Sequence, residues 1–141
     1  MDTCILDASV AVKLFLDQPL RDEARALLAG LDDSPPLRVA APDLLYAECA
    51  NVLWKYARIG YPVAEAAAHL EDLRALPIAI TPTYDLAPEA LRIAAALDVS
   101  VYDACYLALA SILGWGLVTA DERLVRRVAG TRYAATWLGA L

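Results

Sequence analysis

The sequence alternates between short, wholly apolar runs and longer segments in which apolar residues recur every three or four positions. The short runs lack polar alternation, so they predict strands buried on both faces, as in a parallel sheet covered by helices. The longer segments predict the helices that cover it. The expected strands are residues 3–6, 37–40, 77–80, 116–120 and 132–138, and helices are expected at 20–30 and from about residues 8, 42, 62, 83, 103 and 121.

Proline and glycine residues mark where these helices start and stop. Pro42 suits the first turn of a helix that Gly60 would end. Pro88 is tolerable only in the first turn of its helix, which predicts a cap at Thr83 or Asp85. No repeat, low-complexity segment or linker interrupts the pattern, so residues 1–141 are expected to form a single domain.

Residues 104–120 carry no charge and approach the length of a membrane span. Ser111, Gly114 and Gly116 interrupt the run, which therefore predicts a buried helix, a turn and a buried strand. The N-terminal residues contain no basic region and do not resemble a signal peptide. We expect a protein of the cytoplasm that does not associate with a membrane.

The composition limits the chemistry. Hydrophobic residues make up 60% of the chain, which predicts a thick core and a surface for self-association. The net charge of −6 argues against electrostatic nucleic-acid binding over the whole surface, but it allows a nuclease whose acids gather at one metal site. Three cysteines without a CxxC pair predict buried free thiols. The single histidine, His69, is expected on a helix surface, which argues against a zinc site of the histidine and cysteine type and against a serine-histidine triad.

Two acids directly follow predicted strands. Asp7 ends the first strand in CILDAS, and Asp121 ends the fourth in LVTADE. Because ligands bind at the carboxyl ends of strands in open parallel sheets, both acids are expected at one rim. The alternative is that each aspartate merely caps the helix that follows it.

Two further acids lie among apolar residues of predicted helices. Glu48 shares its helix face with Leu44, Leu45 and Val52, and Asn51 lies one turn further on, where it could support Glu48 by hydrogen bonding. The alternative is a glutamate at the helix edge whose carboxylate reaches water. Asp103 opens the apolar segment DACYLALA, where we expect it to be the N-cap of a buried helix.

Several carboxylates that face one another require a cation, and their hard oxygens suit Mg²⁺ or Mn²⁺. Such a site suits phosphodiester hydrolysis. Ser9 and Thr119 lie two residues from Asp7 and Asp121 and could contact a metal-bound water or a phosphate, or they could be ordinary turn hydroxyls. The positive residues that could hold a phosphate backbone are Lys13, Arg92, Arg123, Arg126 and Arg127, and the last three form the best candidate for an RNA-facing patch.

Four stretches together resemble the PIN-domain family, in particular its VapC-type toxin ribonucleases: LDASVAVKLF, YAECANVLW, VYDACYLALA and LVTADERL. They follow the family's order and span nearly the whole chain. The resemblance implies a three-layer α/β/α sandwich with a five-stranded parallel sheet. It also implies an acidic Mg²⁺ or Mn²⁺ site made by Asp7, Glu48, Asp103 and Asp121, with Ser9 at a polar position beside the first acid.

The same resemblance implies endoribonuclease activity, homodimerisation and inhibition by a small antitoxin protein. The acidic composition favours narrow specificity for a structured RNA. A non-catalytic module of the same fold, which binds RNA or protein without cleavage, is the alternative. A phosphoacceptor signalling domain would need a lysine late in the chain, whereas the only lysines are Lys13 and Lys55.

Overall fold

The computed structural model describes all 141 residues and contains a five-stranded parallel sheet of order β3-β2-β1-β4-β5. The strands are β1 (Thr3–Leu6), β2 (Arg38–Pro42), β3 (Ile78–Thr81), β4 (Leu117–Thr119) and β5 (Ala135–Trp137). The parallel sheet, the number of strands and their places in the chain confirm the prediction. β1 lies in the middle, with β2 on one side and β4 on the other.

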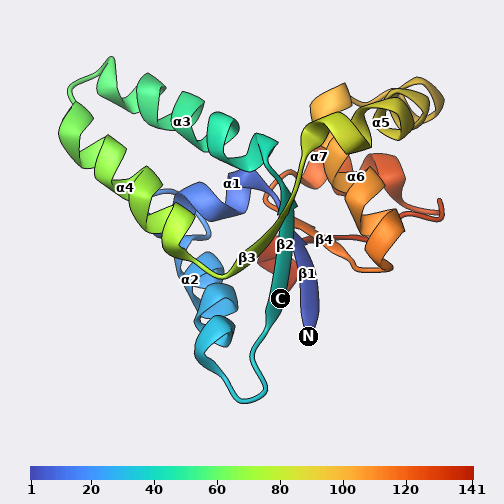
Figure 1. Cartoon of the computed structure of the whole chain (residues 1–141), viewed down its shortest axis with the longest axis horizontal. Coiled ribbons are helices and arrows are strands. Elements are labelled where there is room, and N and C mark those ends of the chain that lie inside the picture. Colours follow the sequence, from blue (N-terminus) through green and yellow to red (C-terminus); the bar gives the residue numbers. More distant parts are fainter.

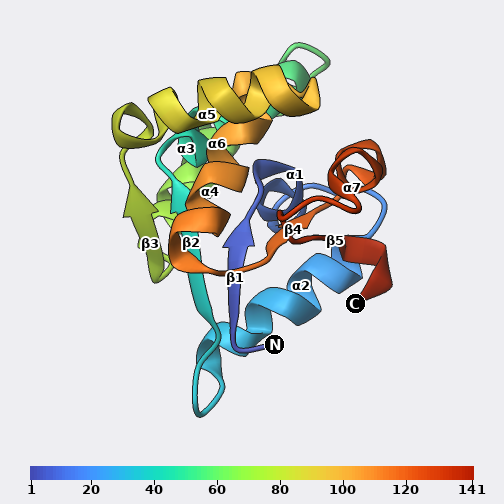
Figure 2. The ribbon, with the colours of Figure 1, turned by 90° about the vertical axis from the view of Figure 1, so that its right-hand side faces the viewer.

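Seven α-helices cover the sheet. They are α1 (Ala8–Ala11), α2 (Arg21–Ala29), α3 (Leu44–Ala57), α4 (Val63–Ala75), α5 (Thr83–Leu97), α6 (Val101–Leu113) and α7 (Glu122–Val128). Helices α1 to α4 lie on one face and α5 to α7 on the other (Figure 1), which makes the predicted three-layer α/β/α sandwich. Turned by 90°, the molecule shows α6 across the near side of the sheet, with α5 lying across the top of α6 (Figure 2).

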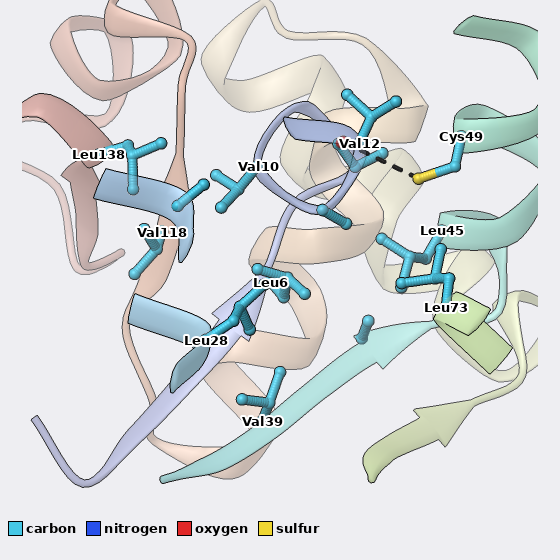
Figure 3. Packing of buried hydrophobic residues seen from close by; sticks show 14 of the residues in the cluster. Leu6, Val10, Val12, Leu28, Val39, Leu45, Cys49, Leu73, Val118 and Leu138 are labelled. Carbon is cyan, nitrogen blue, oxygen red and sulfur yellow. Dashed lines mark hydrogen bonds between the residues drawn. The ribbon is translucent and has the colours of Figure 1, made fainter. Parts of the chain in front are cut away.

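Each central strand sends alternate side chains into two separate cores, as the pleat requires. Leu6 and Val118 join the core under α1 to α4, where they pack with Leu45 and Leu73 (Figure 3). Ile5 from the same strand as Leu6 points into the other core, under α5 to α7. Burial on both faces explains why the strands are apolar at every position, and it fixes their register.

Helix α6 is the central element of the second core. All residues from Ala104 to Ala110 are buried, and the helix ends at Gly114, whose φ of +67° is a left-handed conformation that glycine adopts without strain. The predicted buried helix, turn and strand are therefore confirmed. No single helix is long and apolar enough to cross a membrane; α5 and α6 meet that test only together, bent by 111°.

Two proline predictions were wrong. Pro42 is the last residue of β2, paired with Thr81, because the chain stays extended until Asp43 donates its N–H to the carbonyl of Thr81. Pro88 lies in the second turn of α5, which begins at Thr83 after the cap residue Pro82. The carbonyl that loses its partner there belongs to Tyr84, which is 88% exposed, so water can satisfy it.

The strand order creates one preferred place for a ligand. The chain builds β1, β2 and β3 toward one edge and then crosses back to place β4 on the other side of β1. In such sheets a crevice opens at the carboxyl ends of the strands where the order reverses. That point lies between β1 and β4, which are followed directly by Asp7 and by Ala120 and Asp121.

Candidate active site

Asp7 follows β1 and is only 6% exposed. Its Oδ2 accepts hydrogen bonds from Ser9 Oγ at 2.8 Å and Thr119 Oγ1 at 2.6 Å. The backbone N–H groups of Ala8 and Ser9 also lower the pKa of this carboxyl by hydrogen bonding. Asp7 lines the cleft, so its remaining lone pairs can take a ligand.

The two hydroxyls that hold Asp7 are themselves held by the turn after β4. Ser9 Oγ accepts the N–H of Ala120 at 3.0 Å, and Thr119 Oγ1 accepts the N–H of Asp121 at 3.1 Å. Both hydroxyl protons are thus directed toward Asp7. Thr119 is completely buried, so it is not an exposed turn hydroxyl, and its contact is with the carboxylate itself.

Asp121 caps helix α7, as the alternative interpretation of this residue expected. Its Oδ1 accepts the N–H groups of Arg123 at 2.9 Å and Leu124 at 3.2 Å. Its Oδ2 accepts no hydrogen bond. The cap fixes the direction of the carboxylate and leaves one oxygen available, so capping and ligand binding are compatible at this residue.

Asp103 is not the N-cap of α6, and that prediction was wrong. Ser100 is the cap, because its Oγ accepts the N–H of Asp103 at 3.1 Å and the helix begins at Val101. Asp103 lies in the first turn, where a negative charge interacts favourably with the helix dipole. The Ser100 hydroxyl lowers the pKa of this carboxyl by hydrogen bonding. The carboxylate also lines the cleft, where its remaining lone pairs can take a ligand.

Glu48 projects from α3 and is held by a residue that the sequence did not reveal. Tyr106 of α6, 1% exposed, donates its Oη hydrogen to Glu48 Oε1 at 2.8 Å. Oε2 is unused. Asn51 lines the same cleft but makes no hydrogen bond to Glu48. A tyrosine in an otherwise apolar buried helix needs a partner for its hydroxyl, which was the signal available in the sequence.

These residues meet in one open cleft of about 550 Å³ at the rim of the sheet. Its lining comes from the end of β1, from α3, from the start of α6 and from the turn after β4. The lining residues are Asp7, Ala8, Ser9, Leu44, Ala47, Glu48, Asn51, Val52, Lys55, Tyr102, Asp103 and Asp121. The structure therefore brings all four predicted acids together, although they lie up to 114 positions apart in the chain.

The acids influence one another electrostatically. Burial is the largest cause that raises the pKa of Asp7, Glu48 and Asp103. The charge of Asp7 raises the pKa of both Glu48 and Asp103 further, and the charge of Asp121 adds to that of Asp103. Hydrogen bonds from hydroxyls and backbone oppose these shifts without cancelling them. The cleft thus holds negative charge that lacks compensation from the protein.

The donor set suits a hard divalent cation. Every acid offers at least one free oxygen, and neither sulfur nor imidazole is present in the cleft. No three histidine, cysteine, aspartate or glutamate side chains converge closely enough to hold an ion on protein ligands alone. Mg²⁺ typically binds one or two carboxylates and keeps several waters, so the residues fit such an ion with a partly hydrated shell.

The predicted basic residues have different environments. Arg123 and Arg127 line a second hollow of about 220 Å³ that also contacts Asp103 and Asp121, and Arg127 approaches Asp98 at 3.9 Å. Arg126 forms an ion pair with Glu122 at 3.2 Å, and Arg92 forms one with Glu89 at 3.0 Å. Lys13 is only 8% exposed and donates to Gln18, so it is not part of a surface patch.

The histidine and cysteine residues lie outside the cleft. His69 is half-buried rather than on the surface, because it stacks on Phe15 and hydrogen-bonds the hydroxyl of Tyr61 at 2.6 Å. Cys4, Cys49 and Cys105 are buried free thiols, as predicted. In Figure 3 the sulfur of Cys49 points from α3 toward the turn after β1, where it contacts the carbonyl of Ala8 at 3.9 Å.

Comparisons with known proteins agree with this geometry. Residues 4–130 match the PIN domain family. Ribonuclease VapC3 of Pyrobaculum aerophilum is 29% identical over 87% of this chain and 92% of its own length. Ribonuclease VapC9 of Mycobacterium tuberculosis is 35% identical over 85% of this chain and 87% of its own length.

Solved structures show the same fold. The crystal structure of PAE2754 from Pyrobaculum aerophilum is similar with a TM-score of 0.70 and 26% identity, covering 98% of this chain and 92% of that one. A chain of a toxin-antitoxin complex from Klebsiella pneumoniae has a TM-score of 0.67 at 19% identity, covering 94% of this chain and 96% of that one. Together with its motifs and its acidic cleft, these matches place the chain in the PIN-domain family, among the VapC-type proteins.

Proposed function

We propose that the protein is a metal-dependent endoribonuclease and the toxin of a toxin–antitoxin pair. The observation that carries this proposal is the cleft in which four acids from distant segments each keep a free carboxylate oxygen. The relatives named ribonucleases support the substrate class. We place its activity in the cytoplasm, where a reducing environment suits three buried free thiols.

Each acid has a role in this proposal. Asp7 and Asp103 bind Mg²⁺ or Mn²⁺ directly, Glu48 binds it directly or through water, and Asp121 completes the pocket or holds a second ion. When bound, the ion activates a water and stabilises charge on the leaving oxygen.

The protein's own groups hold and orient the reacting atoms. Glu48 helps to orient the attacking water from the wall formed by α3. Tyr106 holds one Glu48 oxygen by a hydrogen bond, which leaves the other for this role. Ser9 and Thr119 hold Asp7 in the same way. Arg123, Arg126 and Arg127 on α7 contact the RNA backbone beside the acids.

The test is incubation of the purified protein with total RNA in Mg²⁺ or Mn²⁺, followed by mapping of the new RNA ends. We expect internal cleavage that EDTA abolishes. Asp103→Asn is the sharpest variant, because the amide keeps an oxygen that can accept a hydrogen bond from Ser100 and removes only the charge, so the fold should stay intact. Asp72→Asn on the exposed face of α4 is the matched control and should cleave normally.

The same experiment distinguishes the proposed function from its alternatives. Full activity in folded Asp103→Asn protein would contradict the assignment of the acidic cleft as the active site. RNA binding without any cleavage would favour a non-catalytic module of the same fold. Loss of nucleotides only from RNA termini would show that the protein is an exonuclease rather than an endonuclease.

Metal binding has a readout that does not depend on activity. In metal-free protein the uncompensated acids destabilise the folded state, so Mn²⁺ should raise the melting temperature of the wild type. Asp103→Asn should reduce this shift, whereas Asp72→Asn should preserve it. An equal shift in all three proteins would show that the ion binds elsewhere.

We also propose that the protein forms a homodimer and binds an antitoxin protein. Tyr84 and Leu91 on α5 are 88% and 62% exposed, and an apolar groove between α3 and α4 includes Trp54, which is 53% exposed. Apolar surface of this kind marks protein contacts. The related chain from Klebsiella pneumoniae belongs to a toxin-antitoxin complex. Sedimentation as a monomer at high micromolar concentration would contradict the dimer.

A further inference from the structure

Two side chains of the cleft have no role in the proposed chemistry and no partner in the protein. Tyr102 is 62% exposed, and its hydroxyl makes no hydrogen bond. Lys55 is also exposed, forms no ion pair, and is the only lysine or arginine that lines the cleft. An exposed aromatic ring and an unpaired ammonium group at the mouth of an acidic cleft require an explanation.

Helix α6 places Tyr102 at the cleft, one turn before Tyr106. Tyr102 and Tyr106 are four residues apart and lie on the same side of the helix. Tyr106 is buried in the core, and its hydroxyl is bonded to Glu48, which lines the cleft. Tyr102, one turn closer to the helix start and next to Asp103, presents its ring to whatever enters the cleft.

Helix α3 places Lys55 further along the same cleft. The polar residues that α3 contributes to the lining are Glu48, Asn51 and Lys55, spaced by three and four positions, so they form one stripe. Lys55 therefore lies two turns beyond Glu48, about 10 Å along the helix axis. This distance separates the ammonium group from the proposed metal site while both remain in the same cleft.

A second basic region lies on the other side of the acids. The hollow lined by Arg123 and Arg127 shares Asp103 and Asp121 with the main cleft. The acidic site thus has Lys55 on one side and two arginines on the other. A single negatively charged strand that runs from one region to the other passes over the free oxygens of the acids.

We propose that Tyr102 and Lys55 form a nucleotide-binding subsite beside the scissile bond, an inference that rests on the proposed ribonuclease function. A base stacks on the ring of Tyr102, and a phosphate of the same strand pairs with Lys55. Aromatic stacking accepts any base and requires that the base leave its own helix. The subsite therefore takes a nucleotide that is unpaired beside the scissile bond.

The subsite can be tested by binding without cleavage. Fluorescein-labelled eight-nucleotide probes of oligo(A), oligo(U) and an abasic ribose-phosphate chain are titrated with protein carrying Asp103→Asn, in Mg²⁺. Tyr102→Ala and Tyr102→Phe are introduced into this background. Ile112→Ala, which removes a 65% exposed apolar side chain on the same helix outside the cleft, is the matched control.

The expected result is a coupling between the Tyr102 ring and the RNA base, measured as a thermodynamic cycle. Tyr102→Ala weakens binding of oligo(A) by about fivefold or more. Tyr102→Phe and Ile112→Ala leave it unchanged, and the abasic probe does not respond to Tyr102→Ala. Lys55→Ala weakens all three probes, and it reduces the slope of log Kd against log salt by about 0.7, which corresponds to one lost phosphate contact. Arg74→Ala, an exposed cation of α4, leaves the slope unchanged.

Three outcomes overturn the inference. The first is an equal loss of oligo(A) and abasic binding in Tyr102→Ala, which means that the residue supports structure only. The second is unchanged RNA binding with altered sedimentation, which makes Tyr102 a protein contact. The third is no measurable binding of any probe. If wild-type protein cleaves RNA while the coupling between ring and base is zero, the subsite is refuted and the ribonuclease proposal stands. If the wild type does not cleave RNA, the ribonuclease proposal itself is refuted.

Discussion

The hydroxyl of Tyr106 donates a hydrogen bond of 2.8 Å to Glu48 across the interface between α6 and α3. The ring of Tyr106 is in the core under α5 to α7, whereas the carboxylate faces the cleft. One hydrogen bond therefore links the packing of the core to the direction of an acid at the proposed active site.

Removing this hydroxyl tests the link. Tyr106→Phe keeps the ring, so it should destabilise the protein by only about 1 kcal/mol, since water can replace the donor at a half-buried carboxylate. The bond to Tyr106 lowers the pKa of Glu48, so its loss should raise that pKa and move the acid limb of the pH–rate profile to higher pH. Single-turnover cleavage rates measured against pH provide the check, and an unmoved acid limb would show that the ionisation of Glu48 does not control cleavage.

Thr119 offers a matched pair of variants. Thr119→Val removes the donor to Asp7 and the acceptor of the Asp121 N–H at a fully buried position, which should destabilise the protein by about 2–3 kcal/mol. Thr119→Ser keeps the hydroxyl and loses one methyl group, about 1 kcal/mol. Urea unfolding and cleavage rates should both place Thr119→Ser nearer the wild type. If valine were tolerated better than serine, packing rather than hydrogen bonding would be the role of this residue.

The buried Asp7 carboxyl predicts a pH dependence in metal-free protein. Burial raises its pKa in the folded state above the unfolded value, so as pH rises the unfolded chain ionises first and unfolding becomes more favourable. Asp7→Asn has no such titration. Its stability relative to the wild type should therefore increase as pH rises from below the unfolded aspartate pKa through the raised folded one. Urea unfolding in EDTA across this range is the measurement, and a difference that shrinks with pH would refute the assignment.

The cysteines should be inert in the folded protein. Burial raises the pKa of Cys4 to about 11 and that of Cys49 to about 12, and it raises the pKa of Cys105 as well. At pH 8 the thiolate fraction of Cys4 is then about one in a thousand. A disulfide-exchange reagent should modify no thiol at pH 8 until urea is added, and then all three. Immediate reaction of one equivalent in native protein would contradict this burial.

The sequence predicted the sheet, the layers and the location of two acids because these depend on local pattern. Continuous apolar runs indicate strands covered on both faces, and acids after two such runs must lie at the same rim. The partner of Glu48 depended on a contact across 58 positions, which no spacing rule predicts. The cap of α6 was misplaced because Ser100 and Asp103 are both good cap residues one turn apart, and only the backbone geometry separates them.

The hydroxyl contacts across β1 and β4 also govern when the cleft can exist. Asp7 emerges early in synthesis, but the side chain that fixes it comes from Thr119, and Asp121 follows two residues later. A chain still being synthesised, or cleaved before β4, has only part of the acidic cluster and none of the geometry that orients it. Any activity of the cleft is therefore withheld from nascent and truncated chains, and it begins only after the strand that closes the centre of the sheet has docked.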